Sequence, residues 1–267
     1  MIPAPVRYVR AGSVEEALAA LAEPDAKALA GGQSLVSVMK LRLARPELVV
    51  DIGRLELAGV ETREGELRIG ALATWSDLAA APALGRPALA AIAECAAGIG
   101  DLQVRNRGTI GGSLAHADPA SDMPAVLLAL GAHVVVRSAA AERTIETRDL
   151  FLGPFTTALA EGELLTEAVV PLPPAGSGSA YASVEHPASG FALAGAAALV
   201  RSDGSSSVAV TGLGATPFPL DGDPVEALAA AEVFGDRFAP AEYRRHLAGV
   251  VVERALMSAT ARAKEDA

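Results

Sequence analysis

The sequence of 267 residues predicts an α+β protein, and three observations support this prediction. Short apolar runs alternate with helical patterns over residues 1–55, which is typical of a small β-α-β-α-β unit. From residue 180 onward, strand patterns come first and two helical segments follow, which favours an antiparallel sheet covered by helices. Residues 171–179 separate this last unit, because their proline and glycine content can continue neither a helix nor a strand.

The first unit, residues 1–55, is recognised by its helix signals. Ser13 and Glu16 have the capping-box spacing, in which a hydroxyl and a carboxylate bond the free N–H groups at a helix start. Pro46 is expected to stop a second helix, because proline lacks the backbone donor and clashes with the preceding turn. The elements expected here are a strand at 26–30, a helix at about 33–44 and a strand at 48–52.

The second unit, residues 56–172, mixes strands with alanine-rich helical segments. Alanine has the best intrinsic helix propensity, so the run from 87 to 97 is predicted to be helical. The long stretch from 106 to 122 is predicted to be a loop. The other elements expected are a strand at 66–70, a helix starting near Thr74, a helix over 123–130, a hairpin of 133–136 with 142–147, and a strand at 163–170.

The chain is predicted to end in a linker at 173–179 and a C-terminal domain at 180–267. The Ser202-Asp203-Gly204 turn is expected to join two strands of its antiparallel sheet. The elements expected are strands near 180–185, 191–201 and 207–214, and covering helices near 223–234 and 240–263.

Composition excludes several classes of function. The net charge of −10 argues against a nucleic-acid partner, because nucleic-acid phosphates would be repelled. The single cysteine, Cys95, excludes an internal disulfide and an iron–sulfur cluster held by this chain alone. No metal site is predicted, because the histidines are scattered without ligand spacing at His116, His133, His186 and His246.

The sequence contains neither a long apolar run nor a secretory leader pattern. No segment approaches the length of a membrane span, and the start of the chain lacks an apolar core followed by a cleavage site. The sequence therefore predicts a soluble, cytoplasmic protein without a transmembrane segment.

Two glycine-rich stretches carry the strongest functional signal. Residues 30–35, here called the first glycine segment, stand where a strand ends and a helix begins, so a helix N-terminus could hold a phosphate there. Residues 109–113, the second glycine segment, could form a nest of backbone N–H groups for an anion. Together they could hold the two ends of one doubly phosphorylated cofactor. The alternative is that both are only tight connections between elements.

Charged residues beside the second segment admit two interpretations each. Asp118 and Asp122 could act as an acid–base pair, but capping of the loop and hydrogen bonding to a ribose are favoured. Arg105 and Arg107 either bind phosphate or are solvated. No Gly-x-Gly-x-x-Gly follows a strand and no Walker motif occurs, so the usual dinucleotide and P-loop signatures are absent from the sequence. No catalytic acid or base is predicted.

Three motifs in this order resemble the FAD-carrying medium subunits of molybdenum hydroxylases, and most closely those of aerobic carbon monoxide dehydrogenases. The resemblance spans about residues 3 to 257. It implies a two-subdomain FAD-binding domain of the PCMH (vanillyl-alcohol oxidase-like) type, followed by a C-terminal α+β domain. The motifs are residues 27–35, residues 109–113, and residues 151–157 with 162–165.

The resemblance also implies which residues contact FAD. The first glycine segment would supply amides to the pyrophosphate, the second would wrap its other side, and two leucines would lie against the adenine. The full set of expected cofactor-binding residues is Lys27, Leu29, Ala30, Gly31, Gly32, Gln33, Ser34, Leu35, Thr109, Ile110, Gly111, Gly112, Ser113, Ala115, Asp118, Asp122, Leu164, Leu165, His186 and Phe191.

One segment departs from the pattern of the family. His186 stands where arginine is common, and Gly190 stands where aspartate is common. Phe191 matches an aromatic position beside the flavin, although a core aromatic on a strand is an equally good interpretation. How this segment touches the flavin ring therefore stays open at the level of sequence.

The resemblance implies a three-subunit complex that forms a dimer of heterotrimers. A large subunit would carry molybdopterin cytosine dinucleotide with Mo and Cu, and a small subunit would carry two [2Fe-2S] clusters. Electrons would pass through FAD to a quinone, a cytochrome or another acceptor, with peripheral association at the inner face of the membrane through the complex. The leading overall reaction is oxidation of CO to CO2. The alternatives are a purine, aldehyde or N-heterocycle dehydrogenase, and a binding module without enzymatic function.

Overall fold

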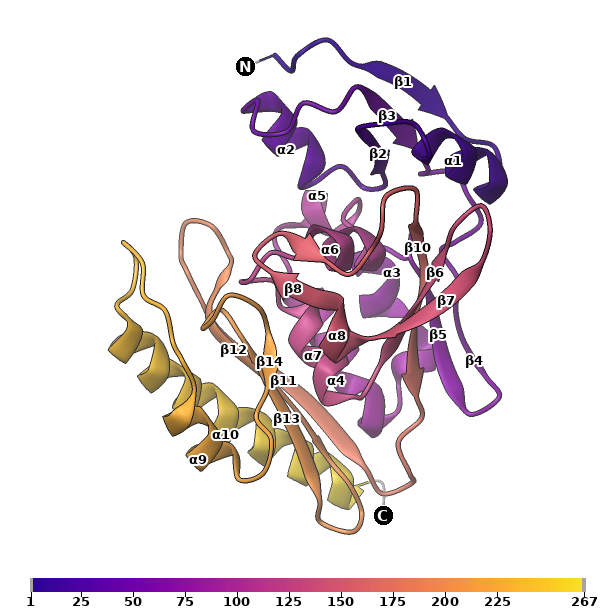
Figure 1. Cartoon of the computed structure of the whole chain (residues 1–267). Helices are drawn as coiled ribbons and strands as arrows, with labels where there is room; N and C mark the ends of the chain where they lie inside the picture. The colour runs from indigo at the N-terminus through magenta and orange to yellow at the C-terminus, as the bar shows by residue number, and fades with distance from the viewer. Residues whose placement is uncertain (1, 266–267) are drawn as a thin grey trace.

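The computed structural model describes residues 2–265, and its first unit is a parallel three-stranded sheet with two helices. The strand order is β1-β3-β2, and every pairing is parallel, which confirms the predicted β-α-β-α-β unit. Figure 1 shows this unit at one end of the molecule. Its elements are β1 (Arg7–Arg10), α1 (Val14–Leu21), β2 (Ala26–Leu29), α2 (Leu35–Lys40) and β3 (Leu48–Asp51).

Helix α1 begins at the predicted cap, whereas α2 is shorter than predicted. The Ser13 hydroxyl accepts from Glu16 N at 3.1 Å, and the Glu16 carboxylate accepts from Gly12 N at 2.8 Å, one residue before the cap itself. Helix α2 ends at Lys40 rather than near 44, because Arg42 adopts a φ of 58° that right-handed helix excludes. The prediction of a helix over 33–44 was therefore wrong at both ends.

The second unit is a five-stranded antiparallel sheet in the order β4-β5-β10-β6-β7, with helices packed against it. The predicted hairpin is confirmed as β6 with β7. Strand β4 was not predicted, because its residues are mostly exposed and show no apolar alternation. The strands are β4 (Val60–Arg63), β5 (Glu66–Gly70), β6 (His133–Arg137), β7 (Glu142–Glu146) and β10 (Leu164–Pro171), and a separate small hairpin joins β8 (Phe151–Gly153) to β9 (Thr156–Thr157).

The stretch from 106 to 122 is not the loop that the sequence predicted, because it contains helix α6 (Ile110–His116). Thr109 caps this helix, since its hydroxyl accepts from Gly112 N at 3.1 Å. The other helices of the unit are α3 (Trp75–Ala80), two short 3-10 turns (Pro82–Leu84 and Pro87–Leu89), α4 (Ala90–Gly98), α5 (Leu102–Arg105), α7 (Met123–Ala129) and α8 (Thr147–Leu150).

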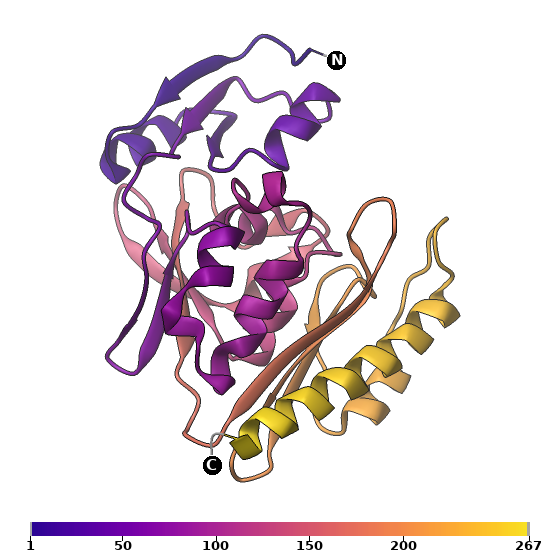
Figure 2. The ribbon, with the colours of Figure 1, turned by 180° about the vertical axis from the view of Figure 1, so that it is seen from behind.

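The C-terminal unit is a four-stranded antiparallel sheet in strand order, with helices against both of its faces. Figure 2 shows the long helix α10 running along its outer face. The predicted Ser202–Gly204 turn is confirmed between β12 and β13. The elements are β11 (Gly178–Glu185), β12 (Ala192–Val200), β13 (Ser206–Thr211), β14 (Phe218–Pro219), α9 (Pro224–Ala230) and α10 (Ala241–Glu265).

Strand β12 explains how this sheet is buried on both faces. Ala196 and Ala198 belong to the core formed with α10, whereas Ala197 and Leu199 belong to the core shared with α4 and α7. Small side chains on both faces allow helices to approach the strand from either side. The C-terminal sheet is therefore packed directly on the helices of the second unit rather than attached by a tether.

The segment 173–179 runs straight into this packing. It is buried from residue 176 onward, and Gly178 begins β11. The Ser179 hydroxyl accepts from Ala91 N at 3.0 Å at the start of α4. We propose that residues 1–55, 56–172 and 180–267 are the domains of the chain, since three hydrophobic cores accompany the three larger sheets.

Candidate functional site

The two glycine segments lie side by side in the structure although 73 residues, 36 to 108, separate them in the sequence. A Cβ on Gly31 would lie 1.8 Å from Arg107 O, so only glycine allows this close approach of the two backbones. Ala30 also lies against the second segment, because a Cβ on Gly112 would be 4.0 Å from the Ala30 Cβ. The structure thus brings together the two segments that were expected to hold one cofactor.

The first glycine segment offers backbone donors. Gly32 has a φ of 78°, which turns the chain sharply between β2 and α2. Within residues 2–265, the amides of residues 31–35 donate to no group of the chain, and the Ser34 side chain makes no capping bond. Several N–H groups are therefore available in one short turn, which is the requirement for binding an anion.

A hollow of about 290 Å³ lies against these free amides. Its wall carries two cations, Lys40 and Arg107, for which no ion pair is found in the described part of the chain. The complete lining is Leu29, Ala30, Gly31, Gly32, Gln33, Val36, Ser37, Lys40, Asp51 and Arg107. Free amides together with two cations suit a diphosphate.

Asp51 is the one carboxylate of this hollow, and three donors engage it. The Tyr8 hydroxyl, Arg10 Nε at 3.0 Å and Gly53 N at 2.9 Å all donate to it. Burial by itself would raise the pKa of Asp51, but these bonds hold that pKa below its usual value. The Arg10 charge compensates Asp51, so this carboxylate does not leave an uncompensated negative charge beside an anion. Sequence reasoning missed Asp51, Lys40 and Tyr8 because none of them belongs to a glycine motif.

The second glycine segment does not form the predicted nest of amides. Ile110 N and Gly111 N donate to Ala73 O and Ala71 O at 3.0 and 2.9 Å, which ties the start of α6 to the end of β5. Gly112 N and Ser113 N donate to the Thr109 hydroxyl and carbonyl at 3.1 and 3.0 Å. The prediction of a second amide nest was wrong, since these amides are already used. This segment instead gives close packing, and Gly112 gives an exposed surface without a side chain.

The two arginines that precede this segment, Arg105 and Arg107, were expected either to bind phosphate or to be solvated, and the structure places them differently. Arg105 Nη1 donates to Ile99 O and Gly100 O at 3.3 and 2.6 Å, so this side chain supports the local chain. Arg107 instead lines the hollow of the first segment. Only Arg107 is therefore placed to meet a phosphate there.

Asp118 and Asp122 lie at the two ends of the turn that follows α6. Asp118 Oδ1 accepts from Ala120 N at 2.9 Å, which confirms the predicted loop capping. Asp122 makes no capping bond to α7 and accepts instead from the Tyr181 hydroxyl. Burial raises the pKa of Asp122 to about 6 despite this bond, and Glu185 and Asp118 add like-charge repulsion. Ser113 Oγ and Ser121 Oγ, 2.7 Å apart, close the turn onto α6.

The remaining predicted residues of the first two units differ in exposure. Leu164 and Leu165 are buried in two different hydrophobic cores, at 5% and 4% exposure, so the adenine contact stays a prediction. Lys27 is exposed on β2, Leu35 begins α2, and Ala115 is exposed on α6. The imidazole of His116, the residue after Ala115, packs against Phe155 of the 151–157 motif with ring centroids 5.2 Å apart and the rings tilted by 52°.

His186 and Phe191 lie in the loop that joins β11 to β12. His186 N donates to Phe191 O at 2.8 Å, and the His186 ring packs against the Phe238 ring at 4.6 Å between centroids, tilted by 55°. Phe191 is 48% exposed, so it is not a core aromatic. Figures 1 and 2 show this loop and the segment before α10 projecting from the same end of the C-terminal sheet.

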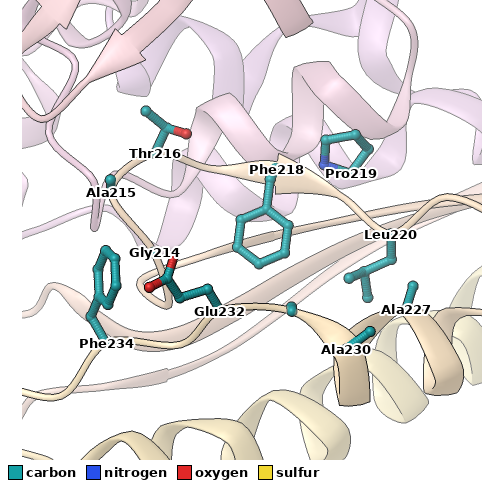
Figure 3. Close-up of a pocket in the computed structure, with 11 residues that line it drawn as sticks. Gly214, Ala215, Thr216, Phe218, Pro219, Leu220, Ala227, Ala230, Glu232 and Phe234 are labelled. Atoms are coloured by element: carbon teal, nitrogen blue, oxygen red, sulfur yellow. The ribbon is translucent and has the colours of Figure 1, made fainter.

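A second hollow, of about 430 Å³, lies between β14 and α9 (Figure 3). Phe218 and Phe234 stand on its wall, and the Glu232 carboxylate points into the space between their two rings. None of the predicted cofactor-binding residues lines it. In residues 2–265 no helix is long and apolar enough for a membrane crossing, and no three His, Cys, Asp or Glu side chains gather as metal ligands would.

Comparison with known proteins defines the class of this chain. Residues 4–173 match the model of the FAD binding domain in molybdopterin dehydrogenase. The chain therefore belongs to this family of FAD-binding oxidoreductase subunits, and the expected resemblance to molybdenum hydroxylase medium subunits is confirmed.

Three matches cover nearly the whole chain. The 6-hydroxypseudooxynicotine dehydrogenase complex subunit alpha of Paenarthrobacter nicotinovorans is 38% identical, over 99% of this chain and 97% of its own length. The carbon monoxide dehydrogenase medium chain of Hydrogenophaga pseudoflava is 37% identical, over 98% of this chain and 99% of its own length. A solved carbon monoxide dehydrogenase from Hydrogenophaga pseudoflava contains a chain with a TM-score of 0.92, 37% identity, and coverage of 98% and 99%. The fold class predicted from the sequence is thereby confirmed.

Proposed function

We propose that this chain is the FAD-carrying electron-transfer subunit of a molybdenum hydroxylase complex. The observation that supports the proposal most strongly is the first glycine segment, where free amides of residues 31–35 meet a hollow with two unpaired cations. Bound FAD supplies the redox chemistry, and the protein supplies binding, orientation and exclusion of competing reactions. The site needs no catalytic acid or base from this chain.

The residues present fit the two chemical parts of such a cofactor. The diphosphate would be held by the amides of Gly31, Gly32 and Gln33, which line the hollow, and of Ser34 next to them, with Lys40 and Arg107 as counter-charges. The second glycine segment would pack beside it without offering further amides. Exposed aromatic surface at Phe191, beside the His186–Phe238 ring pair, would meet the flavin side of the molecule. The full set of contacts proposed from the sequence is retained for this site.

The overall reaction that we propose first is oxidation of CO with water to CO2, two protons and two electrons, carried out in the partner molybdenum subunit. The 37% identity to a carbon monoxide dehydrogenase medium chain supports it. Oxidation of an N-heterocyclic substrate is the second candidate, which the 38% identity to a 6-hydroxypseudooxynicotine dehydrogenase subunit favours. This chain does not contact the substrate in either case, so its own residues do not discriminate between the two reactions.

The proposed complex contains a large molybdenum subunit with molybdopterin cytosine dinucleotide, Mo and Cu, and a small subunit with two [2Fe-2S] clusters. A chain with one buried cysteine cannot hold such clusters itself, so electrons must enter from another polypeptide. We propose a dimer of heterotrimers, a quinone or cytochrome as acceptor, and a cytoplasmic complex that associates with the inner face of the membrane.

Release of the cofactor tests the proposed function directly. The purified chain is denatured, and the supernatant is examined by absorbance and chromatography. We expect about one FAD per chain, together with copurifying large and small subunits when the complex is isolated from its host. A folded chain that releases no flavin and takes up no added FAD would contradict the proposal. Reduction of the isolated complex by CO, compared with reduction by an N-heterocycle, then separates the two candidate reactions.

A further inference from the structure

The C-terminal domain holds the turn at residues 119–122, which follows helix α6, through a set of direct hydrogen bonds. Thr211 Oγ1 lies 3.0 Å from Pro119 O and 2.7 Å from Ser121 O, and it shares its proton between these carbonyls. Gly212 N donates to Pro119 O at 3.0 Å. The Tyr181 hydroxyl donates to Asp122. All of these donors come from β11 and the end of β13, whereas the turn belongs to the FAD-binding unit.

The donors themselves are rigidly placed. Thr211 is fully buried, and Gly195 on the neighbouring strand leaves the space that the Tyr181 hydroxyl occupies, since a Cβ there would lie 2.3 Å from it. Arg244 of α10 is buried, and its Nη1 donates to Leu193 O and Gly212 O at 2.8 and 2.7 Å. The side chain of Arg244 thus fixes the residue that donates to Pro119. A connected path of bonds therefore runs from α10 through β13 to the turn.

The bonds of the turn within its own domain are local. Asp118 Oδ1 accepts from Ala120 N, Asp118 O accepts from Ser121 N at 3.0 Å, and Ser113 Oγ bonds Ser121 Oγ. At its far end, Asp122 O accepts from Ala125 N of α7 at 3.2 Å. The Ser121 carbonyl has Thr211 as its hydrogen-bond partner, and a buried carbonyl that loses its partner is costly. The Ser121 carbonyl and the Asp122 carboxylate are consequently held from the C-terminal domain.

We propose that Tyr181 and Thr211 are positioning residues for FAD, which act by fixing the turn 119–122 beside the second glycine segment. The effect on FAD binding rests on the proposed function, since the turn carries Asp122 of the expected cofactor site. It assigns the C-terminal domain a part in cofactor retention that no glycine motif indicates. Neither side chain needs to touch the cofactor itself.

The test uses Tyr181→Phe and Thr211→Val in the full chain, because each removes one hydroxyl and little volume. Each variant is expected to bind FAD about tenfold more weakly than the wild type, through faster dissociation, since one buried hydrogen bond is lost. Hydrogen exchange in the flavin-free protein should speed up at the amides of residues 120–122 and stay unchanged on β5 and α6. Thr211→Ser keeps the hydroxyl and is expected to behave as the wild type.

Tyr243→Phe and Thr260→Val are the matched controls. Tyr243 is exposed, and the Thr260 hydroxyl bonds only within α10, so both should leave FAD binding and exchange of the turn unchanged. Wild-type exchange and FAD dissociation rates in both Tyr181→Phe and Thr211→Val would overturn the proposal while leaving the proposed function intact. If the wild type itself bound no FAD, the proposed function would fail, but the exchange measurement would still support or refute the positioning of the turn.

Discussion

The two glycine segments look alike in sequence and differ in what they offer a ligand. The first leaves the amides of residues 31–35 without partners in the described chain and places them beside two cations. The second uses the amides of residues 110–113 for bonds to Thr109 and to the end of β5. The comparison shows that a glycine pair does not define an anion site. What defines it is whether neighbouring carbonyls and hydroxyls have already taken the donors.

The largest effect is expected where the two segments touch. Gly31→Ala places a Cβ 1.8 Å from Arg107 O, and a backbone carbonyl cannot move aside cheaply. We expect a loss of about 3 kcal/mol in the free energy of unfolding and loss of retained FAD. Gly59→Ala is the control, since nothing lies within 4 Å of its added Cβ. Denaturant unfolding and flavin content measure both effects, and a Gly31→Ala protein with wild-type stability would show that the two segments are not in contact.

The carboxylates beside the two segments should respond to pH in opposite directions. The folded-state pKa of Asp122 is raised from 3.8 to about 6, so its contribution to stability is present below pH 4 and is lost as pH rises through 6. Asp122→Asn should therefore stabilise the flavin-free protein at pH 7.5, by about 2 kcal/mol. Thermal unfolding from pH 4 to 8 checks this. Equal midpoints of mutant and wild type at pH 7.5 would mean that Asp122 is not desolvated.

The stability contribution of Asp51 should depend on pH in the opposite direction to that of Asp122. Its folded-state pKa is lowered, so its contribution is present above its ordinary pKa and is lost as pH falls below that value. Asp51→Asn should destabilise the protein at pH 7.5, and the difference from the wild type should shrink as pH falls below 4. Thermal unfolding over the same pH series, extended below pH 4, measures this difference in stability. A destabilisation that does not vary with pH would mean that the effect comes from packing rather than from the charge.

The N-caps of the two segments provide a smaller test. Thr109→Ala removes the acceptor for Gly112 N and should cost about 1 kcal/mol of stability. Ser34→Ala removes a hydroxyl that makes no capping bond, so it should leave the flavin-free protein as stable as the wild type. Denaturant unfolding of both variants measures the two changes in stability. Equal losses of stability would contradict the difference between the two caps, because they would mean that Ser34 stabilises its helix as much as Thr109 does.

The smallest effect is expected from the cations of the hollow. Lys40→Met and Arg107→Met should each weaken FAD binding by about threefold to tenfold at low salt, because an exposed charge near an anion contributes modestly. The difference from the wild type should decrease as salt is added. Arg63→Met, on the distant β4, is the control. Titration of the flavin-free chain with FAD measures the affinities, and unchanged affinity at low salt would remove both residues from the site.

Sequence reasoning succeeded where local signals decide the structure. The helix starts at Ser13 and Thr74 and the Ser202–Gly204 turn follow from such signals, and the structure agrees. Helix α6 escaped prediction because glycines disfavour a helix, whereas its start is stabilised by Ala71 and Ala73, which lie far away in sequence. The use of donors in the second segment depends on those same contacts.

The parts of the site that could not be predicted all depend on tertiary contacts. Tyr181 and Thr211 lie on ordinary strands with no motif around them, and their partners are about 60 and 90 residues away. Asp51 becomes a neighbour of the glycine turn only because β2 and β3 are parallel and end at the same edge, and Lys40 lines the same hollow from the end of α2. A pattern of residue types could identify the family, but it could not say which amides remain free.

Hydrogen exchange of the flavin-free chain, before and after addition of FAD, tests the central claim most directly. The account predicts fast exchange at residues 31–35 without FAD and strong protection with it. It also predicts that residues 110–113 are already protected without FAD and change little. Protection that appears on FAD binding at residues 110–113, with none at residues 31–35, would contradict the difference between the two segments and the proposed position of the diphosphate.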